Sequence, residues 1–243
     1  MSLAPTDYDF GVPANYAFAE KITCSNDEAR RMYVEAFGHM LNYNHEQAIA
    51  CFTKCTELDP NCAMAWWGIA YCLSSSYNWS AGLGPGYDAI SQAVSLKDHC
   101  SELEQDLIMA LSKRHTKEAR DNANPAALNM GNSPELNQAF ADAMAPLYEK
   151  YSGDLDVTAV YVEALMNLNP WTLWNKDAST GEITPVDDST LMLIKIMEDA
   201  FENVPGAKEH PALCHLYCHA LELSPYPERA LPAADVLRTL MPG

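Results

Sequence analysis

The stretch from Tyr43 to Leu73, YNHEQAIACFTKCTELDPNCAMAWWGIAYCL, decides the fold. Small and aromatic residues recur in it at helical spacing: Ala48 and Phe52 lie one turn apart, and Cys55 follows after another turn. Small residues allow two helices to approach closely, and an aromatic ring fills the space beside them. Pro60 then ends this helix and permits the next one to begin. The stretch therefore predicts two packed helices joined by a short turn.

The residues Ala48, Phe52, Cys55 and Pro60 stand at offsets 0, 4, 7 and 12. This pattern resembles the tetratricopeptide repeat (TPR), and the match is close over residues 29–76. Weaker copies of the same offsets lie at Leu193, Met197, Ala200 and Pro205, and at Ala230, Ala234, Leu237 and Pro242. The resemblance implies an all-α fold, a right-handed superhelical array of about five helical hairpins.

The helical pattern divides the chain into an N-terminal extension, residues 1–25, and a TPR-like domain, residues 26–243. The expected hairpins are 26–42 with 45–58, 61–75 with 86–99, 101–117 with 134–151, 155–168 with 188–203, and 211–223 with 227–241. Segments 77–86, 118–133 and 169–187 are rich in Gly, Pro, Asn and Asp, so we expect loops there and no strands. Because the sequence stops where a next unit would begin, we expect either further repeats in a longer protein or an oligomer that covers the last helix.

The charge and cysteine content narrow the range of functions. The 243 residues include 15 basic and 33 acidic side chains, which gives a net charge of −18. Such a chain repels nucleic acid, whereas basic peptides or metal cations suit its field. No apolar stretch approaches the length of a membrane span, and the first residues do not form a signal peptide pattern. The eight cysteines include no CxxC pair, so we expect reduced thiols and a cytoplasmic protein.

The TPR resemblance implies that the first helix of each hairpin lines a concave groove. By this count the groove residues include Tyr33, Trp67, Tyr71 and Arg114, whereas Trp66 is expected in the core. Aromatic anchors of this kind suit a peptide or protein segment, or a small molecule.

A second stretch, HPALCHLYCHALEL from His210 to Leu223, carries the most distinctive polar pattern. His215, His219 and Glu222 are spaced by four and then three residues, which places them on one face of a helix. The resemblance implies that this face of the helix lines the concave groove. It also sets Glu163, on the preceding first helix, level with His219 at a separation of roughly 8–10 Å.

The chemistry of these residues leaves two functions open. Two imidazoles and a carboxylate suit Zn²⁺, Fe²⁺, Mn²⁺ or Cu²⁺, with Glu163 as a further ligand or acid–base group. The insertion with Trp171 and Trp174 is long and aromatic, so we expect it to fold back as a wall or lid. A metal-free polar groove or a structural histidine network explains the same residues. The sequence thus favours a TPR-type binding scaffold and keeps a metal-dependent enzyme with a His-His-Glu site as the alternative; it does not decide whether the protein is an enzyme.

Overall fold

Helices account for most of the chain in the computed structural model, which describes residues 22–78, 85–122 and 133–240. The helices are α2 (Asp27–Leu41), α3 (His45–Leu58), α4 (Ala63–Cys72), α5 (Pro85–Leu96), α6 (Glu102–Ser112), α7 (Lys117–Asp121), α8 (Pro134–Lys150), α9 (Leu155–Met166), α10 (Asp188–Asn203), α11 (Pro211–Leu221) and α12 (Leu231–Leu240). Short 3₁₀ turns lie at Lys97–His99, Ala207–Glu209 and Pro227–Ala230, and two strands, β1 (Trp174–Lys176) and β2 (Ile183–Pro185), precede α10. The expected all-α class is confirmed at this level.

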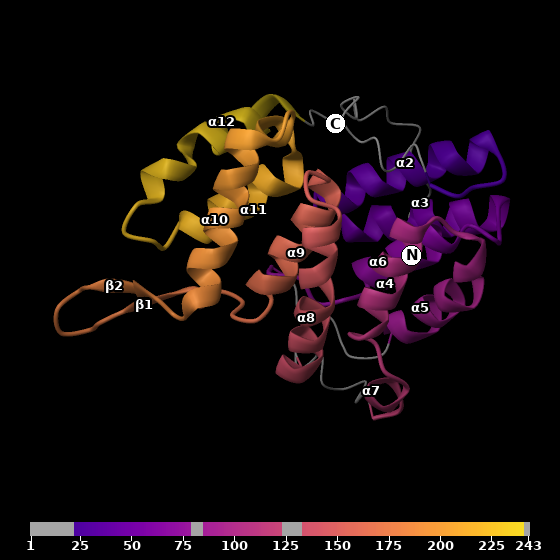
Figure 1. The fold of residues 1–243 in the computed structure, drawn as a ribbon, viewed down its shortest axis with the longest axis horizontal. Coiled ribbons are helices and arrows are strands. Elements are labelled where there is room, and N and C mark those ends of the chain that lie inside the picture. The colour runs from indigo at the N-terminus through magenta and orange to yellow at the C-terminus, as the bar shows by residue number, and fades with distance from the viewer. Residues whose placement is uncertain (1–21, 79–84, 123–132, 241–243) are drawn as a thin grey trace.

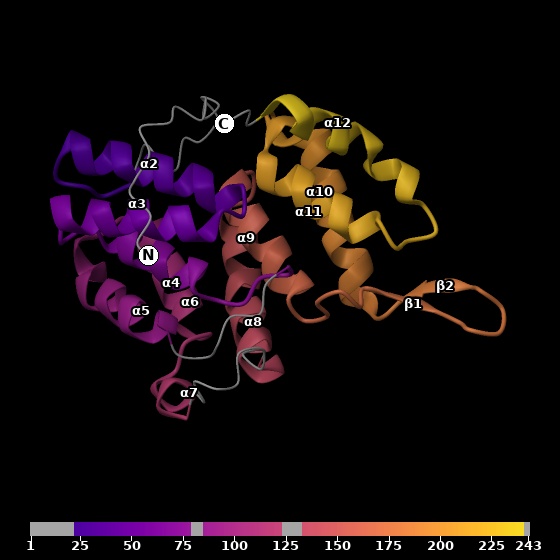
Figure 2. The same cartoon turned by 180° about the vertical axis from the view of Figure 1, so that it is seen from behind.

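Neighbouring helices pack in chain order. Each of the five expected hairpins is a packed pair: α2 with α3, α4 with α5, α6 with α8, α9 with α10, and α11 with α12. First helices of successive hairpins also touch, as α2 with α4, α4 with α6, and α9 with α11. Helices α8 and α9 lie between the group α2–α6 and the group α10–α12 (Figures 1 and 2). Side chains of α9 can therefore contact helices of both groups.

Local capping chemistry explains where several helices begin. The hydroxyl of Ser101 accepts a hydrogen bond from the N–H of Glu104, whose carboxylate accepts one in return from the N–H of Ser101. Ser133 caps α8, and the following Pro134 occupies its first turn. Asp154 caps α9 by accepting from two backbone N–H groups. These caps are readable in the sequence and fix the helix boundaries within a few residues.

The expected loops are only partly loops. Residues 169–187 contain the antiparallel pair β1–β2, in which Trp174 faces Pro185, and this hairpin projects from the helices (Figure 1). The expectation of no strands was wrong because both strands are three residues long and show no apolar alternation. The first residues of the expected loop 118–133 belong to helix α7, and Thr116 caps the N-terminus of this helix. Residues 79–84 and 123–132 lie outside the described part, as do residues 1–21 of the expected extension.

The end of the expected N-terminal extension docks on the helices. Ile22 is buried, and both the N–H and the hydroxyl of Thr23 donate to the carboxylate of Glu104, at 2.7 Å each. The Arg30 guanidinium donates to the carbonyl of Ile22. Residues 22–25 thus join the packed structure at α6. Among the described helices, none is long and apolar enough to cross a membrane.

The contact between α3 and α4 requires a residue without a side chain. Gly68 of α4 faces the ring of Phe52, which is fully buried. A Cβ at Gly68 would lie 2.4 Å from the nearest ring carbon, inside any permitted contact. Phe52 of the first hairpin and Gly68 of the second therefore pack as a matched pair across α3 and α4.

We expect Gly68→Ala to lower the free energy of unfolding by about 1–3 kcal/mol, because the added methyl group forces the Phe52 ring out of place. Urea denaturation of the full chain measures this. In a Phe52→Leu background the same change should cost much less, since the smaller side chain leaves room. An equal loss in both backgrounds would contradict the packing described above.

Candidate functional site

The carboxylate of Glu163 is the centre of a buried polar cluster. Glu163 lies on α9 and is 5% exposed. The hydroxyl of Tyr71, at the end of α4, donates a short hydrogen bond to Oε2, and the hydroxyl of Tyr43 lies 3.5 Å from the same atom. The backbone N–H of Tyr77 also donates to this carboxylate, and the Arg114 guanidinium is close enough to act on it electrostatically. Side chains that are up to 120 residues apart in the sequence thus meet at one group.

Burial dominates the electrostatics of this cluster. Loss of hydration raises the pKa of the Glu163 carboxyl, and the Tyr71 hydroxyl and the Arg114 charge offset only part of the rise. The same burial raises the pKa of both tyrosine hydroxyls and lowers that of Arg114. Glu163 is therefore a group whose protonation is tuned by its surroundings, as is common at functional sites.

A strained turn places Tyr43 against Glu163. The N–H of Tyr43 bonds to the carbonyl of Met40, and the N–H of Asn44 bonds to that of His39, which together form a Schellman motif at the end of α2. The position after the C-cap needs a positive φ and is usually glycine, but here Tyr43 adopts φ 58°. Outside glycine, the described residues hold one other positive φ, at Trp171 (62°), which borders the same cluster. Such strain concentrates at functional sites.

His215 of α11 extends the cluster beyond Tyr43. Its imidazole stacks on the Tyr43 ring with centroids 4.4 Å apart and meets His219 edge-on at 4.7 Å. Burial and the neighbouring His219 lower the pKa of His215 to about 4, so its ring is neutral near pH 7. Its Nε2 is buried and has no hydrogen-bond partner among the described residues. The same holds for Nε2 of His45 and Nη2 of Arg114, so a polar ligand would find several unused donors and acceptors here.

His219 and Trp171 form the outer rim. Nδ1 of His219 lies 2.8 Å from Oε1 of Glu222, and Nε2 lies 2.9 Å from the side-chain nitrogen of Asn78. Tyr77 stacks on Trp171 at 5.2 Å, and both rings contact His219. Trp171 is 52% exposed, whereas Tyr77 and Glu163 are 2% and 5% exposed, so Trp171 is the member of this group that is open to solvent.

The cluster gathers at the C-terminal ends of first helices. Tyr43 follows α2, Tyr71 ends α4, Arg114 follows α6, and Glu163 occupies the last turn of α9. Helix C-termini carry a partial negative charge, which adds to that of the acidic side chains and raises the cost of ionising Glu163.

The predicted metal set is brought together in part. His215 and His219 contact each other and His219 pairs with Glu222, while Glu163 lies behind Tyr43. Because both nitrogens of His219 already have polar partners, binding a metal there would require at least one of them to leave. Metal binding by His215, His219 and Glu222 stays a prediction.

The predicted ligand-binding residues divide into rim and core. Trp171 and Tyr71 lie in the cluster, and Trp174 packs on α11, where its indole N–H donates to the carbonyl of Ala220 at 2.7 Å. By contrast Tyr33 and Trp67 are 0% and 1% exposed. They can touch a ligand only if their neighbours move.

The two adjacent tryptophans of α4 exchange their expected places. Trp67 donates its indole N–H to the carbonyl of Leu107 on α6 and is buried there. Trp66, expected in the core, is only half-buried. Arg114 is also buried, held by Asn137 at 3.0 Å and lying over the ring of Phe140. These positions are not on an open face because α6 covers Trp67 and α8 covers Arg114.

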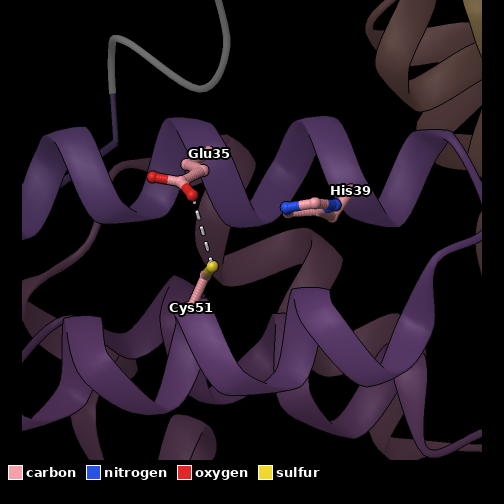
Figure 3. Close-up of side chains that lie close together, drawn as sticks. All are labelled: Glu35, His39 and Cys51. Atoms are coloured by element: carbon pink, nitrogen blue, oxygen red, sulfur yellow. Dashed lines mark hydrogen bonds between the residues drawn. The ribbon is translucent and has the colours of Figure 1, made fainter. Parts of the chain in front are cut away.

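A second group of metal-ligand side chains lies in the first hairpin. Glu35 and His39 of α2 and Cys51 of α3 place one potential ligand atom each within 4.8 Å of the others (Figure 3). This is the set of three found in the described part of the chain, and such a set can hold a metal ion. Sequence reasoning missed it, although Glu35 and His39 are one helical turn apart.

Sequence reasoning also missed Tyr43, Tyr77, Asn78 and His45. The signal for Tyr43 is a bulky residue directly after a helix end, where glycine is usual.

No protein-family model matches the chain, and no curated protein or solved structure matches it either. The description of the site therefore rests on its own geometry.

We expect Glu163→Gln to flatten the pH dependence of stability. Since burial raises the folded-state pKa of Glu163, its contribution is fully present below the unfolded pKa and is lost as pH rises through the folded pKa. The free energy of unfolding of the parent minus that of the variant should therefore fall with rising pH. Glutamine keeps an acceptor for Tyr71, and the histidine contributions cancel in the difference. A difference that is constant or rises with pH would contradict the assigned shift.

Proposed function

We propose that this chain is a binding protein of the TPR type that holds a peptide or protein segment with a positive charge at the Glu163 cluster. The observation that carries the proposal is the convergence on one buried carboxylate of side chains from α4, α9 and the turn after α2. Folding alone does not need this arrangement, because burying such a group costs free energy unless its partners compensate. A buried polar cluster that is costly for folding and lies next to the exposed Trp171 suits ligand recognition.

We infer a right-handed TPR-like superhelix as the scaffold of this site. Five hairpins in chain order support it, as do the contacts of α2 with α4, α4 with α6, and α9 with α11. The motif spacing of Ala48, Phe52, Cys55 and Pro60 adds to this support. We assign the protein to the cytoplasm, since all eight cysteines are free thiols.

Electrostatics favours a cationic ligand group. The chain carries a net charge of −18, and Glu222 is exposed at the rim. The nearby helix C-termini add favourable interactions with a cation, each worth about 0.3–1 kcal/mol. Arg114 neutralises part of the Glu163 charge inside, so the exposed Glu222 is the stronger partner for an incoming lysine or arginine.

The aromatic rim supplies the second part of recognition. Tyr77 and Trp171 are stacked, and Trp171 leaves a face exposed to solvent. A cation above an indole ring gains about 0.5–1 kcal/mol at exposed sites and more when it is desolvated. Nε2 of His215 is buried and lacks a partner among the described residues, so a polar group of the same peptide could bond to it only after neighbouring side chains move.

We expect peptides rich in Lys and Arg to bind more tightly than neutral or acidic peptides of matched length. Fluorescence anisotropy with a labelled peptide panel measures this. Trp171→Ala should raise Kd about tenfold, which is about 1.4 kcal/mol, because it removes the rim platform. Glu222→Gln should weaken binding severalfold, and more so at low salt.

Glu182→Gln is the matched control, since it removes the same charge from the exposed β1–β2 hairpin, away from the cluster. It should leave Kd within error of the parent. Affinity that ignores peptide charge, or that falls equally in Glu222→Gln and Glu182→Gln, would sink the proposal.

A second candidate, an enzyme, is favoured by the opposite pKa shifts of Glu163 and His215. A carboxyl with a raised pKa is an acid and an imidazole with a lowered pKa is a neutral base, which together suit proton transfer. In the metal-dependent form His215, His219 and Glu222 would hold the ion. The loop with Trp171 and Trp174 would then cover the substrate.

Metal content separates this candidate from the binding protein. Mass spectrometry on protein purified without nickel should find one equivalent of metal that is lost in His215→Ala/His219→Ala if the enzyme form is right, and Cys51→Ser should not remove this equivalent. An unchanged metal content in the double histidine variant, or no uptake of Zn²⁺, Fe²⁺, Mn²⁺ or Cu²⁺ by the parent, would reject the metal-dependent form.

A further inference from the structure

The first hairpin contains a polar group of side chains that the Glu163 cluster does not use. In Figure 3, Glu35 extends from α2 toward Cys51 of α3, and the His39 ring lies along α2 on the side of Glu35. The Cys51 thiol is 0% exposed and His39 is 3% exposed, while Glu35 is half-buried. An acid, an imidazole and a thiol thus lie inside a helix pair at positions where apolar packing would be simpler.

The distances fit ligands of one ion. Sγ of Cys51 lies 3.8 Å from Oε1 of Glu35, which is long for a strong hydrogen bond. Two ligands of a tetrahedral zinc ion, with Zn–S near 2.3 Å and Zn–O near 2.0 Å, are separated by roughly 3.5 Å. One ligand atom from each of the three side chains lies within 4.8 Å of the others, so small side-chain rotations would bring them into coordination range.

The chemistry of the three groups suits a borderline-soft cation. A neutral imidazole such as that of His39 can bind a metal ion through a ring nitrogen. A thiolate and a carboxylate together balance a divalent charge inside the protein. The set of sulfur, nitrogen and oxygen ligands is one that zinc accepts, and thiolate selects against magnesium and calcium.

We propose that Glu35, His39 and Cys51 form a site for one Zn²⁺ ion between α2 and α3. On binding, the S–H bond of Cys51 is replaced by an S–Zn bond and the proton passes to solvent. The half-buried Glu35 marks the exposed side, where a water molecule or an external ligand completes the coordination. This site is independent of the proposed function of the Glu163 cluster.

Cobalt titration of the full chain, stripped with a chelator, tests the proposal because Co²⁺ replaces Zn²⁺ and reports thiolate ligation by a charge-transfer absorption. The parent should bind about one equivalent with this band, and Zn²⁺ should abolish it. Cys51→Ser should remove the band, and Glu35→Gln or His39→Ala should weaken binding at least tenfold. The double variant His215→Ala/His219→Ala should keep the band, which separates this site from the candidate metal set on α11.

Cys55→Ser is the matched control, because Cys55 lies one turn farther along α3 and is equally buried. It should keep both the band and the affinity. A parent without the thiolate band would overturn the proposal, as would equal losses in Cys51→Ser and Cys55→Ser. If Cys51→Ser fails to fold by circular dichroism, Glu35→Gln decides: an affinity equal to that of the parent would reject the site.

Discussion

The hydrogen bond from the Tyr71 hydroxyl to the Glu163 carboxylate links the two halves of the molecule. Tyr71 ends α4 and Glu163 lies near the end of α9, so the bond spans 92 residues of sequence. A buried carboxylate without such donors would cost several kcal/mol. The C-terminal ends of α4 and α9 must therefore keep their relative positions, so that Tyr71 can still donate to the Glu163 carboxylate. Tyr43, which approaches the same oxygen, is held there by a backbone turn that would otherwise favour glycine.

The strain at Tyr43 and Trp171 has a common location. Both residues adopt positive φ directly after a helix or close to its end, and both present an aromatic ring to a histidine of α11. A glycine in either place would relax the backbone and remove the ring. The chain accepts a backbone conformation that costs free energy and gains a fixed aromatic surface beside polar groups. That exchange is characteristic of a site, because packing alone would select the unstrained residue.

The Glu163 cluster and the Glu35, His39 and Cys51 group solve the burial of polar side chains differently. Around Glu163, hydroxyl donors and the nearby Arg114 charge compensate the carboxylate inside the protein. In the first hairpin, the thiol of Cys51 lies 3.8 Å from Oε1 of Glu35 and 3.9 Å from Nε2 of Gln47. The Glu163 carboxylate is stabilised by hydrogen bonds that exist in the protein itself. In the Glu35, His39 and Cys51 group, a bound cation would draw the three side chains closer together. A strongly acidic chain suits both.

The sequence by itself determined the ten helices of the five hairpins and their pairing, but not α7 or the two strands. The segments His45–Leu58 and Asp188–Asn203 have the predicted boundaries, and Ser101, Ser133 and Asp154 cap helices as their positions indicate. These features depend on interactions within a few residues, which local pattern reports directly. The sequence also placed His215, His219 and Glu222 on one side of α11. Only the tertiary structure decided that Tyr43 joins Glu163, that Trp67 is covered, and that Cys51 faces Glu35 and His39. Those contacts join residues distant in sequence, and their distances depend on how helices rotate and pack, which no local spacing specifies.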